Sequence, residues 1–171
     1  MKMGKSISKN LMSSTPFGYK KRQKEIKMIE QDTVKLLREC DLGIKMGVSA
    51  IDDVLPYATS DRLLERLCSS KKEHERLEEE CEKMLDSYHD DGKDPNPMVK
   101  GMSWFKTNMK LAINGSDHTI ATLICDGCSM GIKSLSGYLN EYEAAEERAK
   151  DIAKKLIAME DSLAVGMRDF L

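Results

Sequence analysis

The sequence is poor in aromatic residues and proline, and it has no long apolar run. Aromatic residues make up 5% of its 171 residues, it has 4 prolines, and no apolar stretch approaches the roughly 20 residues of a membrane-spanning helix. Charged residues make up 33%, and there are 12 methionines. Many helix formers and few helix breakers predict an all-α chain of long helices, and the length suits one domain.

Acidic residues are missing from the start of the chain. Residues 1–24 carry seven lysines and arginines and no Asp or Glu, although the whole chain has a net charge of −2. Residues 1–22 also lack helical periodicity, which predicts a disordered basic arm ahead of a single domain at 23–171. The arm is either a solvated tail or a contact for nucleic acid or an anionic surface. Its densest basic cluster is Lys20, Lys21 and Arg22.

A paired set of cysteines is missing as well. The chain has 5 cysteines, an odd number, and most of them fall on apolar helical stripes. The first residues also lack the apolar core of a secretion signal. These features predict free thiols in a reducing compartment, the cytoplasm, rather than a disulfide framework.

Apolar residues recur at helical spacing in five segments. Between residues 29 and 54 the stripe residues lie three or four positions apart, which is typical of a long helix packed nearly parallel to its neighbours. Clusters of Thr, Ser, Asp, Asn, Gly and Pro separate most of the segments, and Asn140 is the expected break before the last one. The predicted helices cover about 24–56, 61–88, 98–113, 117–139 and 141–170.

The order of these segments predicts a four-helix bundle with an additional helix in its central connection. A loop of only a few residues makes the first two long helices an antiparallel hairpin, and the last two form a second hairpin. The connecting helix at 98–113 would be about 22 Å long and would carry the chain back along the bundle. The second and third long helices would then run parallel.

Several stretches resemble a known group of proteins. They are Gly115 to His118, Met130 to Ile132 and Tyr138 to Tyr142, which follow the proline-bearing connection. Together with the two hairpins they resemble the ferritin-like four-helix-bundle superfamily, in particular an uncharacterised bacterial branch that lacks the di-iron ligands. The resemblance implies the crossover bundle fold over about residues 25–171.

The di-iron ligands of that superfamily do not fit this sequence. Its metal-binding members use a Glu on each of two helices and a Glu-x-x-His on each of the other two. Only Asp86-x-x-His89 approaches the second motif, and the last helix has no His. No stripe position that we assign on the first, third or fourth long helix is Asp or Glu. We therefore expect no metal, no cofactor, and an interior without converging acids and imidazoles.

His74 is the most interesting single residue, because it lies mid-helix on an apolar stripe. If the helices pair as predicted, Gly43, Ile44 and Gly131 come level with it. The small residues Gly43, Gly47 and Gly131 would then leave room for the imidazole. One interpretation is a core histidine that bonds to a neighbouring side chain. The other is a ligand or metal-binding role.

The remaining candidates for a site are weak. Cys125 and Cys128 have the C-x-x-C spacing of redox and zinc sites, but they fall inside a helix and no second such pair lies nearby. The sequence has no Gly-rich phosphate loop, no H-E-x-x-H helix and no catalytic triad order, which leaves an enzymatic role open but disfavoured. If a metal site exists, its candidate ligands are His74, Cys81, Cys128, Cys125 and His118.

The connecting helix carries an adaptable apolar face. This face either covers one flank of the bundle or binds a partner or a second copy of the chain. Its residues, with Trp104 offset from the stripe, are Met98, Met102, Trp104, Phe105 and Met109. The sequence thus favours a non-catalytic bundle that acts by self-association or partner binding. The alternative is a metal-binding or redox-sensing protein with a degenerate site near His74, Cys81 and Cys128.

Overall fold

The computed structural model describes residues 16–92 and 116–171. These residues form four α-helices and two short 3-10 helices, and they contain no strand, which confirms the all-α prediction. The α-helices are α1 (Pro16–Val54), α2 (Asp61–Ser87), α4 (Asp117–Glu141) and α5 (Glu147–Met167). The 3-10 helices are Leu55–Tyr57 and Arg168–Phe170.

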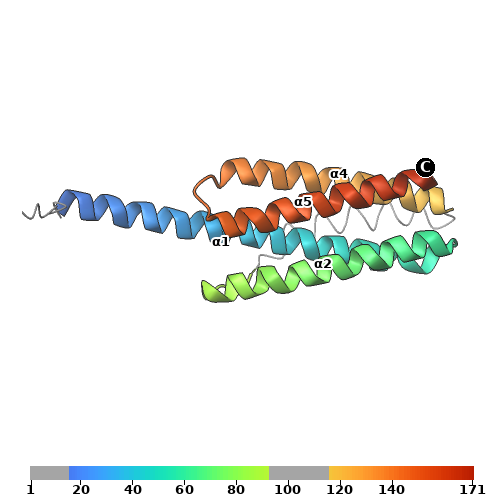
Figure 1. The fold of residues 1–171 in the computed structure, drawn as a ribbon, viewed down its shortest axis with the longest axis horizontal. Helices are drawn as coiled ribbons and strands as arrows, with labels where there is room; N and C mark the ends of the chain where they lie inside the picture. Colours follow the sequence, from blue (N-terminus) through green and yellow to red (C-terminus); the bar gives the residue numbers. More distant parts are fainter. Residues whose placement is uncertain (1–15, 93–115) are drawn as a thin grey trace, which may run out of the picture.

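The four long helices pack side by side as two antiparallel hairpins (Figure 1). The helices α1 and α5 run in one direction, and α2 and α4 run in the other. Contacts at the two ends agree, because Arg62 pairs with Asp169 at one end and Tyr88 donates to Glu146 at the other. The helices α2 and α4 each pack against both α1 and α5. The predicted parallel direction of α2 and α4 is therefore confirmed.

Two apolar clusters fill the interior on either side of a polar layer. Leu36 and Leu156 belong to one cluster, and Leu63 and Leu163 belong to the other. Full burial of each such leucine stabilises the fold by about 1.5–3 kcal/mol. The predicted stripe of α2 is buried from its first turn onward, at Leu63, Leu67, Ser70, His74, Leu77, Cys81 and Met84.

The first helix begins earlier than the sequence indicated. Residues 16–22, assigned above to a disordered arm, form the first turns of α1. Pro16 suits a first helical position because its fixed φ is helical and it needs no N–H partner there. The residues from Gly18 to Gln31 are all exposed, and this part of α1 projects past the other helices (Figure 1). Residues 1–15 and the predicted connecting helix at 98–113 lie outside the described residues.

Side chains on one hairpin fix the ends of the other. Asp117, in the first turn of α4, accepts hydrogen bonds from the backbone N–H groups of Thr59 and Ser60 at 2.8 and 3.0 Å. At the opposite end, the backbone N–H of Glu146 donates to the Thr33 hydroxyl at 2.9 Å. The break expected at Asn140 lies one residue before the end of α4. The buried Thr33 thus sets where α5 starts on α1.

Asp117→Ala should lower the free energy of unfolding at neutral pH by about 1–2 kcal/mol, since several donors lose a charged acceptor. The hydrogen bonds from Thr59, and then those from Ser60, lower the pKa of Asp117. Its contribution is therefore present above the ordinary Asp pKa and is lost as pH falls through the lower folded value. Urea unfolding at several pH values measures this contribution, with the exposed Asp126→Ala as control. Equal losses of unfolding free energy in both variants would contradict a stabilising contact between Asp117 and the α1–α2 turn.

Candidate functional site

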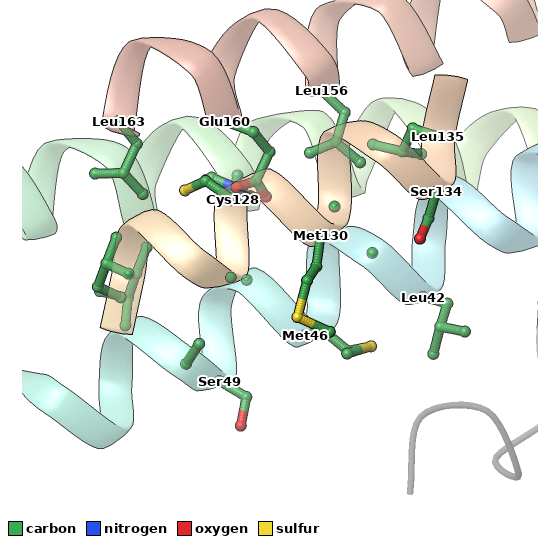
Figure 2. Close-up of a pocket in the computed structure, with 18 of the residues that line it drawn as sticks. Leu42, Met46, Ser49, Cys128, Met130, Ser134, Leu135, Leu156, Glu160 and Leu163 are labelled. Atoms are coloured by element: carbon green, nitrogen blue, oxygen red, sulfur yellow. Dashed lines mark hydrogen bonds and ion pairs between the residues drawn. The ribbon is translucent and has the colours of Figure 1, made fainter. Parts of the chain in front are cut away.

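A groove of about 250 Å³ lies between α1 and α4 (Figure 2). Small residues form much of its walls, with Gly43 and Gly47 on α1 and Gly127 and Gly131 on α4. Met130, whose side chain is 48% exposed, stands at its rim. Because glycine has no side chain, these positions leave the space between the two helices open to the interior.

The floor of the groove is a buried ion pair in the polar layer between the two apolar clusters. His74 on α2 is fully buried, and its Nε2 lies 3.4 Å from Oε1 of Glu160 on α5. Its Nδ1 lies 2.8 Å from the backbone oxygen of Ser70. A carbonyl oxygen only accepts, so Nδ1 carries a hydrogen and Nε2 faces the carboxyl group. The contact is favourable when a proton lies between Nε2 and Glu160.

The surroundings of His74 favour its charged form. Burial alone lowers the pKa of the imidazole, but the hydrogen bond to Glu160, the bond to the Ser70 carbonyl and the Glu160 charge outweigh it. The net effect is a pKa above the ordinary value for histidine. His74 is therefore an imidazolium over a wider pH range than a free histidine would be.

Cys128 on α4 is the third group of this cluster. Burial, the charge of Glu160 and a hydrogen bond to its carboxylate all raise the pKa of the Cys128 thiol. The thiol is therefore protonated at neutral pH and acts as a donor to Glu160. A buried thiol in this state is a weak nucleophile and a poor metal ligand.

The sequence predicted an interior without converging acids and imidazoles, and this prediction is wrong. Glu160 is only 8% exposed and Asp41 on α1 only 4% exposed. On α5 the nearest apolar residue one turn after Leu156 is Met159, whereas the buried row passes from Leu156 to Glu160. A stripe that steps four residues on from Leu156, as the α1 stripe steps from Leu36 to Cys40, would have included Glu160. The preference for a non-catalytic role therefore has to be argued from the geometry of the cluster.

Of the three glycines predicted to leave room for His74, the structure places only Gly47 against the imidazole. A methyl group added at Gly47 would lie 3.0 Å from the imidazole, and one at Gly131 would lie 3.7 Å from the Glu160 carboxyl carbon. Gly43 instead faces Leu156 at 3.4 Å. Close approach of α1 to α2 and α5 at this level therefore depends on Gly47 above all.

The other candidate ligands do not join the cluster. The buried Cys81 donates to the Leu37 carbonyl in the other apolar cluster, and burial raises its pKa to about 12. The partly buried Cys125 lies 3.6 Å from the Ala164 carbonyl. His118 is exposed in the first turn of α4. Of the residues singled out in the sequence, His74 and Cys128 are brought together and the remaining three are not.

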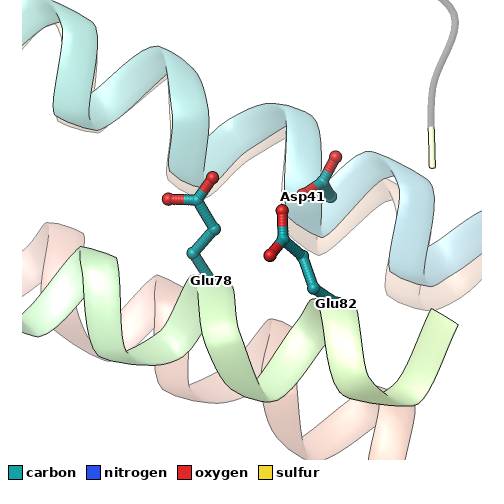
Figure 3. A group of neighbouring side chains, drawn as sticks. All are labelled: Asp41, Glu78 and Glu82. Atoms are coloured by element: carbon teal, nitrogen blue, oxygen red, sulfur yellow. The ribbon is translucent and has the colours of Figure 1, made fainter. Parts of the chain in front are cut away.

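A second polar group joins α1 to α2. The carboxylates of Asp41, Glu78 and Glu82 converge within ligand distance of one another (Figure 3). The Lys45 ammonium lies 2.8, 3.8 and 3.2 Å from them. Burial lowers the pKa of Lys45, but the bonds to Asp41 and Glu82 and their charges raise it overall. A metal ion would have to compete with Lys45, so we interpret this group as an ion-pair network.

No protein-family model, curated protein or solved structure matches the chain. In the two described ranges, none of the helices combines the length and the apolar character that crossing a membrane requires.

Gly47→Ala should destabilise the fold by about 1–3 kcal/mol, because the new methyl group pushes His74 away from Glu160. Gly127→Ala is the matched control, since nothing lies within 4 Å of a methyl group there. That control should stabilise the protein by about 0.5–1 kcal/mol through helix propensity. Urea unfolding measures both, and a stabilised Gly47→Ala protein would contradict the close contact.

Glu160→Gln should remove the pH dependence that the ion pair confers. Because the folded pKa of His74 is raised, its contribution is complete below the unfolded pKa and is lost as pH rises through the folded one. The difference in unfolding free energy between wild type and variant should therefore be larger near about pH 6 than near about pH 9. Urea unfolding measures this difference, and NMR titration of the His74 ring follows its protonation. An equal difference at both pH values would contradict the assignment of His74 and Glu160 as an ion pair.

Proposed function

We propose that the protein is a non-catalytic helical bundle that binds an amphipathic helix of a protein partner in the groove between α1 and α4. The observation that carries this proposal is the groove itself, which is open, mostly apolar and walled by glycines. Helix-in-groove recognition uses such a surface, because side chains of the bound helix insert between the walls. The thioethers of Met46 and Met130 at the rim adapt to the shape of an incoming helix.

The polar groups of the floor support binding rather than chemistry. Both ring nitrogens of His74 have partners, and the Glu160 carboxylate accepts from His74 and Cys128. A general base or nucleophile needs a free reactive atom within reach of a substrate. The cluster instead satisfies its own hydrogen bonds and gives the groove a charged floor.

We also propose that the bundle has the ferritin-like crossover topology. Parallel α2 and α4, joined by a connection long enough to return along the bundle, support the ferritin-like crossover topology. The five free cysteines support a reducing, cytoplasmic location.

The alternative is a metal-binding or redox-sensing site. Convergence of His74 and Cys128 on Glu160 favours it. Against it stand the protonated thiol of Cys128 and the position of Cys81, two turns or about 10 Å along α2 from His74. Elemental analysis of the purified protein tests it, and a stoichiometric bound metal would replace the binding proposal.

Gly127→Leu should weaken the binding of apolar molecules in the groove. The leucine enters open space on the groove wall and favours the helix, so the fold should persist. Gly137→Leu is the matched control, because it lies on the same helix, is equally open and does not line the groove.

The measurement is the fluorescence of Nile red, a neutral dye that brightens in apolar surroundings, at the lowest chain concentration that gives a signal. We expect saturable binding by wild type and by Gly137→Leu, and at least a tenfold weaker affinity for Gly127→Leu, about 1.4 kcal/mol. Equal binding by all three proteins would rule out the groove as the binding surface.

A further inference from the structure

The chain that joins α2 to α4 is attached to α1 at both of its ends. Beyond the end of α2, the Asp90 carboxylate accepts hydrogen bonds from the Arg38 guanidinium at 2.8 and 2.6 Å. Gly92 is buried, and a methyl group added there would lie 3.1 Å from a carboxylate oxygen of Asp41. At the other end, the first turn of α4 is bonded to the turn that follows α1. Residues 93–115 therefore connect two points that both contact α1.

The path between these two points passes over the groove. The helices α2 and α4 flank α1 on opposite sides, so a chain that leaves α2 over α1 has to cross the outer face of α1 to reach α4 (Figure 1). The groove lies on that path, because residues at its rim share a face of α1 with Arg38. At steps of three or four residues from Arg38, these are Leu42, Met46 and Ser49 (Figure 2).

The connection fits the groove in length and in apolar pattern. The sequence predicts a helix at 98–113, about 22 Å long, and the groove spans about 21 Å along α1, from Glu39 to Asp53. One face of the predicted helix is apolar, with the spacing of three and four residues that the described helices bury. Thioethers on that face adapt to a wall of glycines. The stripe residues are Met98, Met102, Phe105, Met109 and Ala112.

The charges of the groove and of the predicted helix are opposite. Apart from Glu160, which is paired with His74, the groove is lined by the carboxylates of Glu39 and Asp53. None of the described lining residues is Lys or Arg. The predicted helix has no acidic residue, and its charged residues are Lys100, Lys106 and Lys110. Opposite charges of this kind favour the groove over other surfaces as a binding place for the helix.

We infer that residues 98–113 of the same chain occupy the groove and compete there with the partner helix. The inference rests on the proposed function, because it states what the partner has to displace. A segment attached at both ends has an effective concentration of the order of millimolar at its own groove. A free helix binds only to the molecules whose groove is empty, so its apparent affinity falls by that fraction.

The first test places charge on the stripe in the full chain. Met102→Glu with Phe105→Glu alters the face that enters the groove, whereas Thr107→Glu is the control, because it lies on the opposite face of the predicted helix. Nile red should bind at least about tenfold tighter to the stripe variant than to wild type or to Thr107→Glu, since the groove is then empty. Adding Gly127→Leu to the stripe variant should remove most of this gain.

The second test follows the segment itself by amide hydrogen exchange. Peptides that cover 98–113 should exchange at least about tenfold more slowly in wild type and in Gly137→Leu than in the stripe variant. Gly127→Leu fills the groove from the α4 wall, so it should speed exchange in the same peptides at least about threefold over wild type. Mass spectrometry measures the exchange, and circular dichroism confirms that each variant is folded.

The outcomes separate this inference from the proposed function. Equal dye affinity in the stripe variant and wild type, or exchange in 98–113 that Gly127→Leu leaves unchanged, overturns the inference alone. If Gly127→Leu speeds that exchange but the stripe variant binds no dye, the segment occupies the groove and the proposed function falls, because the emptied groove accepts no other molecule. Unchanged exchange together with no dye binding by any variant overturns both.

Discussion

The buried pair of His74 and Glu160 is the constraint on which the middle of the molecule depends. Burying two charges is costly unless each has close partners, and here the Ser70 carbonyl and the Cys128 thiol supply them. The imidazole and the carboxylate also need space, which no side chain on α1 or α4 may fill. Gly47 and Gly131 meet that need, and the open groove above the pair is the result.

The polar layer also divides the interior into two apolar clusters. A continuous apolar core would let four helices with similar stripes slide by a turn without much loss, whereas a charged pair fits only one register. His74 on α2 and Glu160 on α5 therefore fix these two helices relative to each other. The network of Lys45 with Asp41, Glu78 and Glu82 fixes α1 against α2 in the same way.

The sequence predicts the elements of this fold better than it predicts the site. Periodicity places α2 to within one residue, and the direction of the hairpins follows from the short loop. It brings His74 level with Gly43 and Ile44, one helical turn from Gly47, which is the glycine that the imidazole contacts. Glu160 was missed because a rule that selects apolar residues passes over a buried acid, whose partner lies 86 positions away in sequence. The start of α1 was missed because an exposed helix has no buried face to impose a pattern.

The two hairpins are held together at both ends, and in the middle the His74–Glu160 pair joins α2 to α5, whereas α1 and α4 are separated by the groove. Asp117 holds the start of α4 on the α1–α2 turn, and Thr33 holds the α4–α5 turn on α1. Transient opening of the bundle is therefore a separation of α1 from α4 along the groove, with both ends closed. Deuterium from solvent would enter first at the amides around Gly47 and Gly131, and the groove would widen for a guest without the helices coming apart.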